Sequence, residues 1–130
     1  MTKNIFVAFG HHNTKNSFNA SVRDTFIDEA KKCGHNIDLI NLHEEQQLNF
    51  FDGKPPNDQV LDYRKRLEKS DVMFLISPCY NLRASAILEN WIDLVLAPKW
   101  FFAFKRVYGN WGYPVAGVMK NKLAIMSMSY

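Results

Sequence analysis

The chain has 130 residues, of which 47% are hydrophobic, so it is long and apolar enough to build one core. Its net charge is only +3, and its basic residues are scattered along the sequence. Binding to nucleic acid is therefore not expected, because it needs a basic face with interleaved aromatic side chains. The most apolar later region, Trp91 to Phe104, is interrupted by Asp93, Pro98 and Lys99, so no membrane span is expected.

We expect a single domain over residues 1–130, because the sequence contains no repeat and no low-complexity tract. Cys33 and Cys79 lack the spacing of a metal site, and we expect both to stay reduced in a cytoplasmic compartment. His11 and His12 are adjacent in a predicted loop and cannot easily face one ion without further ligands. No metal site is therefore expected.

The first elements are a strand, a polar loop and a helix. Residues Asn4 to Phe9 form an apolar run that predicts a buried strand. The polar stretch from Gly10 to Asn16 predicts a loop, and residues 17–33 predict a helix that Gly34 ends. On this helix we expect an inner face formed by Val22, Phe26, Ile27 and Ala30. The charged residues Arg23, Asp24, Asp28 and Lys31 are expected outside this face.

The rest of the chain continues the alternation of strands and helices. In chain order the sequence predicts a strand at 35–42, a turn-rich stretch at 43–57, a helix at 58–70, an apolar strand at 71–77, a loop at 78–83, a helix at 84–96, a long aromatic connection at 98–120 and a strand at 122–127. The helix at 58–70 is expected to turn Val60, Leu61, Arg64 and Leu67 inward and to keep its other charged side chains in solvent.

This alternation predicts an α/β fold with a parallel sheet and right-handed crossovers. In the strand order 2-1-3-4 the first and third strands lie side by side. Their following loops, residues 11–17 and 78–83, then form one crevice at the carboxyl edge of the sheet. A dinucleotide fingerprint is absent, since Gly10 stands alone where G-x-G-x-x-G would be needed.

The junction between the first strand and its helix predicts an anion site. The first N–H groups of a helix have no partner within the helix, and the helix dipole adds a partial positive charge there. Lys15 and the hydroxyls of Thr14 and Ser17 lie close to it in sequence. The expected guest is the phosphate of a mononucleotide-type group. Ser17 and Asn19 also have a simpler interpretation as helix-capping residues.

Four segments in register resemble the flavodoxin-like NAD(P)H:quinone oxidoreductases, a family that includes quinone reductases and ancillary proteins of potassium-efflux systems. His12 with residues 17–20 (SFNA) resembles the family's H-x(4)-S-F-N segment. Pro78 with residues 86–93 resembles its P-A-I-L-K-G-W-I-D stretch. Residues 100–104 (WFFAF) are similar to its G-F-A-F segment, and residues 117–122 (GVMKNK) to its G-L-L-K-G-K turn.

The resemblance implies a flavodoxin-like three-layer sandwich with strand order 2-1-3-4. It also implies bound FMN or FAD, NAD(P)H as the electron donor, a quinone-like acceptor and a homodimer. Family members hold the cofactor phosphate at the first loop and the isoalloxazine ring at the loop after the third strand. By resemblance, the cofactor-binding residues are His12, Ser17, Phe18 and Asn19 at the phosphate, and Pro78, Cys79, Tyr80 and Asn81 at the ring.

The sequence departs from the family pattern in two places. Tyr80 and Asn81 stand where the family has tryptophan, and Ser85 replaces a proline. Residues 127–130 align with the end of strand four, where the family continues into a Gly-Gly loop. We therefore expect the fifth strand to be missing and the strand at 122–127 to be an edge that pairs with another chain or aggregates.

Several interpretations stay open. Instead of an enzyme, the chain fits a non-catalytic flavodoxin-like module that binds flavin or regulates a partner. Tyr80 either stacks on a flavin or covers the third helix, whereas Cys79 is expected to be a buried, inert cysteine. The aromatic run at 100–104, with Trp111 and Tyr113, forms either a dimer surface or a substrate-pocket wall.

Overall fold

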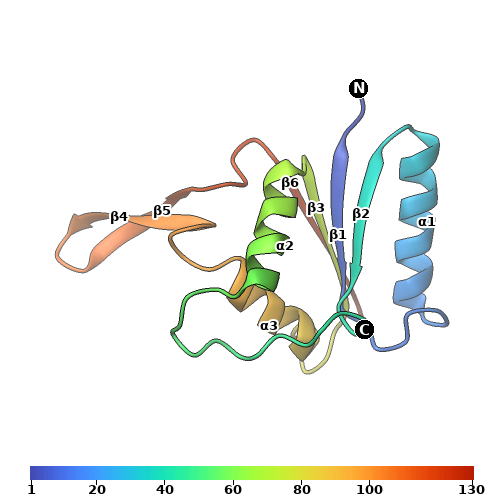
Figure 1. Cartoon of the computed structure of the whole chain (residues 1–130), viewed down its shortest axis with the longest axis horizontal. Coiled ribbons are helices and arrows are strands. Elements are labelled where there is room, and N and C mark those ends of the chain that lie inside the picture. Colours follow the sequence, from blue (N-terminus) through green and yellow to red (C-terminus); the bar gives the residue numbers. More distant parts are fainter.

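The computed structural model describes residues 1–130, except for the side chain of Ala116. Three layers stack on one another, with α1 on one face of a sheet and α2 and α3 on the other (Figure 1). The elements are β1 (Asn4–Phe9), α1 (Phe18–Lys32), β2 (Asn36–Asn41), α2 (Asp58–Lys69), β3 (Val72–Pro78), α3 (Ala86–Val95), β4 (Phe102–Tyr108), β5 (Trp111–Ala116) and β6 (Leu123–Ser129). In the described part of the chain, no helix is long and apolar enough to cross a membrane.

The main sheet has four parallel strands in the order β2-β1-β3-β6, which confirms the predicted flavodoxin-like order. β1 lies between β2 and β3, so Val7 pairs with Leu39 on one side and with Phe74 on the other. β6 forms one edge of the sheet, where Leu123 and Met126 are exposed. The carboxyl ends of all four strands point the same way, as parallel pairing requires.

Alternate residues of β1 enter two different cores, because successive side chains of a strand point to opposite faces. On the face covered by α2 and α3, Phe6 stacks on Trp91 with ring centroids 5.8 Å apart. On the face covered by α1, Val7 and Phe9 join Phe74, whose ring meets Phe26 edge-on at 4.5 Å. A strand buried on both faces explains why its sequence is almost continuously apolar.

Two helix faces differ from the sequence prediction. Arg23 was expected outside the inner face of α1, yet only 7% of it is exposed. In α2, Tyr63 is buried, whereas Leu61 points to solvent. Helical spacing alone cannot anticipate either result. The tyrosine hydroxyl finds a partner in Glu45 at 3.2 Å, and the guanidinium of Arg23 finds three partners described below.

The charged side chains of α2 do more than solvate its surface. Arg66 donates to both carboxylate oxygens of Asp38 on β2, and this ion pair raises the pKa of the Arg66 guanidinium. Arg64 donates to the carbonyl oxygens of Leu94 and Val95 at 2.9 and 3.1 Å, at the carboxyl end of α3. These contacts cap a helix end whose carbonyls lack partners in the helix.

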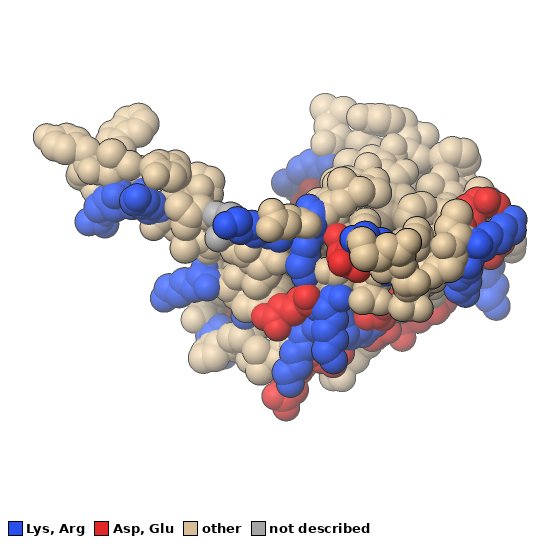
Figure 2. Space-filling view, turned by 90° about the horizontal axis from the view of Figure 1, so that it is seen from above, with Lys and Arg blue, Asp and Glu red and all other residues tan. Residues whose placement is uncertain are grey.

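The expected aromatic connection at 98–120 contains a second, two-stranded sheet. β4 and β5 pair antiparallel around the turn at Gly109, and the hairpin projects from the main body (Figures 1 and 2). Phe104, Tyr108 and Trp111 are 67%, 83% and 80% exposed. These strands were not predicted from the sequence, because their side chains lack the apolar alternation that one buried face imposes.

Acidic and basic side chains are interspersed over the body on the face that Figure 2 shows. The hairpin carries its own basic residues, Lys105 and Arg106 on β4. At its base, the Trp100 ring lies under the guanidinium of Arg64 at 5.1 Å, and its Nε1 donates to Glu68 at 3.1 Å. The hairpin is therefore anchored to α2 through Trp100.

Candidate functional site

The fold brings the two predicted loops together at the carboxyl ends of β1 and β3. Ser85 Oγ donates to the carbonyl oxygen of Gly10 at 2.6 Å, and Ser85 N–H donates to Ser77 Oγ at 2.8 Å. Both serines are buried. Gly10 N–H donates to the carbonyl oxygen of Ile76. Ser85, which the sequence marks only as a departure from the family pattern, therefore joins the first loop to the start of α3.

The first loop is closed by the side chain of Asn13. Its Oδ1 accepts the N–H groups of Lys15 and Asn16 at 3.2 and 2.8 Å, and its Nδ2 donates to the carbonyl oxygen of Asn16. Ser17 Oγ donates to the carbonyl oxygen of Asn13 and accepts Ala20 N–H at 3.1 Å. Ser17 thus has the capping role that the sequence left as an alternative, and Asn13 was not anticipated at all.

Three consecutive N–H groups remain without an acceptor in the described part of the chain, those of Ser17, Phe18 and Asn19. They lie where α1 begins, so the helix dipole adds to their positive potential. Phe18 is 71% exposed, and the site is therefore open to solvent. This arrangement can bind an anion through backbone groups alone.

Asn19 links this helix start to the edge strand. It is 3% exposed, and its Nδ2 donates to Ser129 Oγ of β6 at 2.8 Å. Its Oδ1 has no hydrogen-bond partner among the described residues. Sequence reasoning placed Asn19 in the cofactor site, and the structure brings it to the same edge of the sheet as the second loop.

The second loop is a tight turn. Tyr80 and Arg83 exchange backbone hydrogen bonds of 2.8 and 3.0 Å, and both residues between them, Asn81 (φ 51°) and Leu82 (φ 61°), have positive φ. This pattern is that of a type I′ turn. Asparagine tolerates such a conformation, but leucine rarely adopts it.

The residues around this turn differ in exposure. Pro78 is buried at the end of β3, and Tyr80 is 47% exposed. Cys79 was expected to be buried, but it is only half-buried, and its N–H donates to the carbonyl oxygen of Ser129 at 2.7 Å. Strand pairing with β6 continues through Pro78, so the cysteine lies just past the last paired residue, at the rim of the site.

His12 belongs to a group of three imidazoles beside the first loop. Its ring stacks on His11 at 4.4 Å and meets His43 edge-on at 6.4 Å. His11 Nδ1 accepts Asn13 N–H at 2.9 Å. Burial and the neighbouring His12 lower the pKa of His11, and burial with both neighbours lowers the pKa of His43. Across the described residues, no three metal-type ligands converge on one point.

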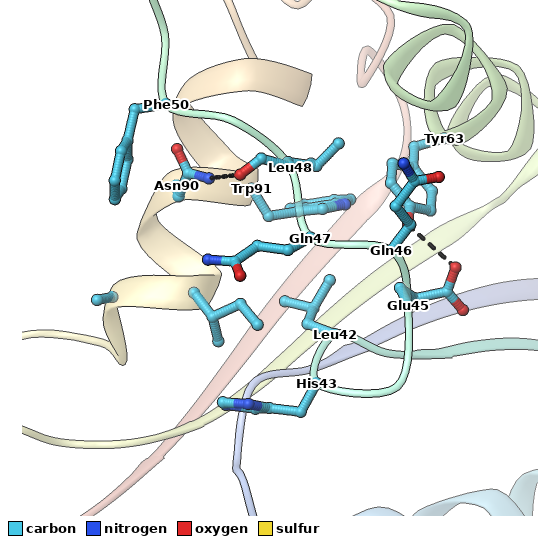
Figure 3. Close-up of a pocket in the computed structure, with 12 residues that line it drawn as sticks. Leu42, His43, Glu45, Gln46, Gln47, Leu48, Phe50, Tyr63, Asn90 and Trp91 are labelled. Atoms are coloured by element: carbon cyan, nitrogen blue, oxygen red, sulfur yellow. Dashed lines mark hydrogen bonds between the residues drawn. The ribbon is translucent and has the colours of Figure 1, made fainter.

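A separate cavity of about 390 Å³ lies between the stretch after β2 and α3 (Figure 3). Leu42, Leu48, Phe50 and Trp91 form its apolar walls, and Gln47 and Asn90 contribute amides. Trp91 Nε1 is buried and has no hydrogen-bond acceptor among the described residues. No sequence pattern indicated this cavity, because its walls come from a turn-rich stretch and a distant helix.

A comparison with protein families matches residues 3–130 to the one described as having a flavodoxin-like fold. The chain belongs to this family. Its sequence is 24% identical to the ribosyldihydronicotinamide dehydrogenase (quinone) of Mus musculus, over 98% of this chain and 63% of that protein. It is 25% identical to the FMN-dependent NADH:quinone oxidoreductase of Coprothermobacter proteolyticus, over 99% of this chain and 68% of that protein.

Solved structures show the same fold. Smu.1420 from Streptococcus mutans superposes with a TM-score of 0.80 at 21% identity, over 98% of this chain and 68% of that one. The chain spans 63% of the length of the mouse relative. The family assignment therefore covers nearly the whole of this chain but only part of that larger protein.

Proposed function

We propose that the protein is a flavin-dependent NAD(P)H oxidoreductase that reduces a quinone-like acceptor. The observation that carries this proposal is the row of three unpaired N–H groups at Ser17, Phe18 and Asn19, at the same edge of the sheet as the loop after β3: Asn19 and Cys79 both bond Ser129. The relative from Coprothermobacter, named as FMN-dependent, supports the choice of FMN. FAD is the alternative cofactor.

The residues present fit a flavin phosphate. The N–H groups of Ser17, Phe18 and Asn19 would hold it, and His12 is the further phosphate residue that the family resemblance gives. Pro78, Cys79, Tyr80 and Asn81 would lie against the ring, the four positions that the family resemblance gives. A flavin supplies two-electron transfer between a nicotinamide and an acceptor when it is bound.

The chain's own contribution is to position both ends of such a ligand. The hydrogen bond from Ser85 to Gly10 sets the first loop against the start of α3. The side chain of Asn13 holds the loop closed, so that it does not have to be ordered when the ligand binds. The backbone pair between Tyr80 and Arg83 does the same for the second loop.

One substitution tests the phosphate site with little cost to the fold. Phe18→Pro removes one unpaired N–H, and proline is favoured at the first position of a helix. Ser17 already has the extended φ and ψ of −131° and 156° that a following proline requires. The matched control is Phe18→Ala, which removes the exposed ring but keeps the N–H.

We expect Phe18→Pro to weaken FMN binding by about tenfold, since one charge-assisted hydrogen bond is lost. Riboflavin, which has no phosphate, should bind both variants and the parent protein alike. Quenching of flavin fluorescence measures each dissociation constant. A parent protein that binds FMN no more tightly than riboflavin would contradict the phosphate site.

The catalytic part of the proposal has its own measurement. The FMN-loaded protein should oxidise NADH or NADPH in the presence of a soluble quinone, and separate titrations with FMN and FAD decide the cofactor. Tight flavin binding with no turnover would instead indicate the non-catalytic module.

Both cysteines, Cys33 and Cys79, are free thiols, which supports a reducing, cytoplasmic location.

We also propose a homodimer whose interface includes the β4–β5 hairpin. Tyr108 and Trp111 expose large aromatic surfaces there, and such residues commonly anchor protein interfaces. The double variant Tyr108→Ser/Trp111→Ser should shift the protein to monomers in size-exclusion chromatography with light scattering. Phe51→Ser, which removes a 63% exposed ring from another loop, is the control. A monomeric parent protein would refute the dimer.

A further inference from the structure

Arg23 is a buried cation beside the candidate phosphate site. It lies on α1, is 7% exposed, and its guanidinium covers the Phe9 ring at 4.5 Å. A charge at such a position is costly unless it is paired and hydrogen-bonded. Three elements supply its partners, so the side chain has one defined arrangement.

Each nitrogen of the guanidinium has a separate acceptor. Nε donates to Asp24 Oδ1 at 2.7 Å, and Nη1 donates to Asn41 Oδ1 at 3.0 Å. Asn41 is itself oriented, because its Nδ2 donates to Glu44 at 2.8 Å. Nη2 donates to the carbonyl oxygen of Thr14 at 2.8 Å. Arg23 therefore ties the first loop to α1 and to the end of β2.

The bond to Thr14 matters because of where that carbonyl lies in the chain. In an α-helix the N–H of a residue donates to the carbonyl four positions earlier. For Phe18 that carbonyl belongs to Thr14. Arg23 holds this oxygen on the loop side, and Ser17 keeps the extended φ and ψ of an N-cap, so α1 begins at Phe18 and Phe18 N–H has no acceptor.

We propose that Arg23 is a positioning residue for the phosphate site, because it fixes Thr14 of the first loop against α1 and β2 and so helps to keep the helix start, with its free Phe18 N–H, open to a phosphate. This inference rests on the proposed flavin function and adds a residue to it. Arg23 acts through the loop and not by touching the ligand.

The test compares FMN with riboflavin in Arg23→Met and in Lys31→Met. Lys31→Met removes an exposed positive charge from the same helix, so it controls for net charge. We expect Arg23→Met to lower the affinity for FMN about tenfold and that for riboflavin less than about twofold. Lys31→Met should leave the ratio of the FMN and riboflavin dissociation constants, here called the FMN-to-riboflavin ratio, unchanged.

A second readout does not need flavin. In Arg23→Met the loop loses its tie to the guanidinium and can wind on to α1, which would pair Phe18 N–H with the Thr14 carbonyl, so amide exchange at Phe18 should become slower than in the parent protein. Arg23→Lys, which keeps one donor for Thr14, should restore part of the FMN affinity. Equal FMN-to-riboflavin ratios in Arg23→Met and Lys31→Met, or unchanged exchange at Phe18, would overturn the proposal.

If Arg23→Met does not fold, Asn41→Ala replaces it, because it leaves the charge but removes the Nη1 acceptor that orients the guanidinium toward Thr14. A smaller fall of the FMN-to-riboflavin ratio is then expected, and an unchanged ratio rejects the role of Arg23. Failure of the proposed function looks different, because the parent protein itself would then show no preference for FMN. In that case the inference fails with it.

Discussion

Ser85 and Gly10 are 75 positions apart in the chain, yet Ser85 Oγ donates to the Gly10 carbonyl oxygen at 2.6 Å. A Cβ atom on Gly10 would lie 2.8 Å from this Oγ and 2.9 Å from Leu88 Cβ. Position 10 therefore needs glycine because of close packing. The contact joins the two loops of the candidate site.

Gly10→Ala should destabilise the protein by about 1–3 kcal/mol, because the new methyl group has no space against Ser85 and Leu88. Urea unfolding followed by circular dichroism measures the change. The double variant Gly10→Ala/Ser85→Ala should lose less than the sum of the two single losses, since removing the hydroxyl relieves part of the clash. Additive losses would show that Ser85 is not what crowds the methyl group.

Ser85→Ala alone leaves the buried carbonyl of Gly10 without the hydroxyl donor. We expect a loss of about 1–3 kcal/mol in the free energy of unfolding. Ser21→Ala is the control, because Ser21 is exposed on α1 and its hydroxyl makes only a 3.4 Å contact. Similar stabilities of Ser85→Ala and Ser21→Ala would mean that the contact contributes little.

Leu82→Gly should stabilise the protein by about 0.5–1 kcal/mol, the relief of left-handed backbone strain minus the entropy that glycine loses on folding. The side chain is 86% exposed at φ 61°, so its removal sacrifices little packing. Leu82→Ala, which keeps a Cβ atom, should give no such gain. Thermal unfolding distinguishes the two variants, and a gain shared by both would point away from strain.

Arg64→Met should lower stability by about 1–2 kcal/mol, because two carbonyls at the end of α3 lose their donor and Trp100 loses the cation above its ring. Lys65→Met removes a neighbouring exposed charge and should be close to neutral. Chemical denaturation provides the comparison. Hydrogen exchange in the β4–β5 hairpin should also rise in Arg64→Met, since Trp100 anchors its base.

Acidification should destabilise the protein through His11 and His43. Both pKa values are lowered in the folded protein, so the unfolded chain binds protons more readily, and stability falls as the pH drops through about 6.5. We expect the melting temperature of His11→Asn/His43→Asn to change less than that of the parent protein between about pH 7.5 and 5.5. The amide oxygen introduced by His11→Asn keeps an acceptor for Asn13 N–H. If the melting temperatures of the two proteins change equally with pH, these histidines are not the cause of the acid destabilisation.

Local patterns were enough to predict the main sheet and the three helices. β1 was predicted at its observed bounds, and helix ends at Ser17 and Gly34 were visible because capping preferences act on neighbouring residues. The positions of Ser17, Phe18 and Asn19 at the helix start followed from the same reasoning. Polar residues buried by distant partners gave no comparable signal.

Arg23 shows why. Its spacing on α1 looked like that of a solvated residue, and only the approach of Asn41 and Thr14 makes its burial possible. The hairpin from Phe102 to Ala116 stayed hidden for the opposite reason, since none of the side chains described in its two strands is buried, and the strands therefore carry no periodic apolar pattern. Short-range periodicity identifies elements that pack on a core, whereas contacts between residues far apart in the chain, such as Ser85 with Gly10, exist only once the layers have closed around them.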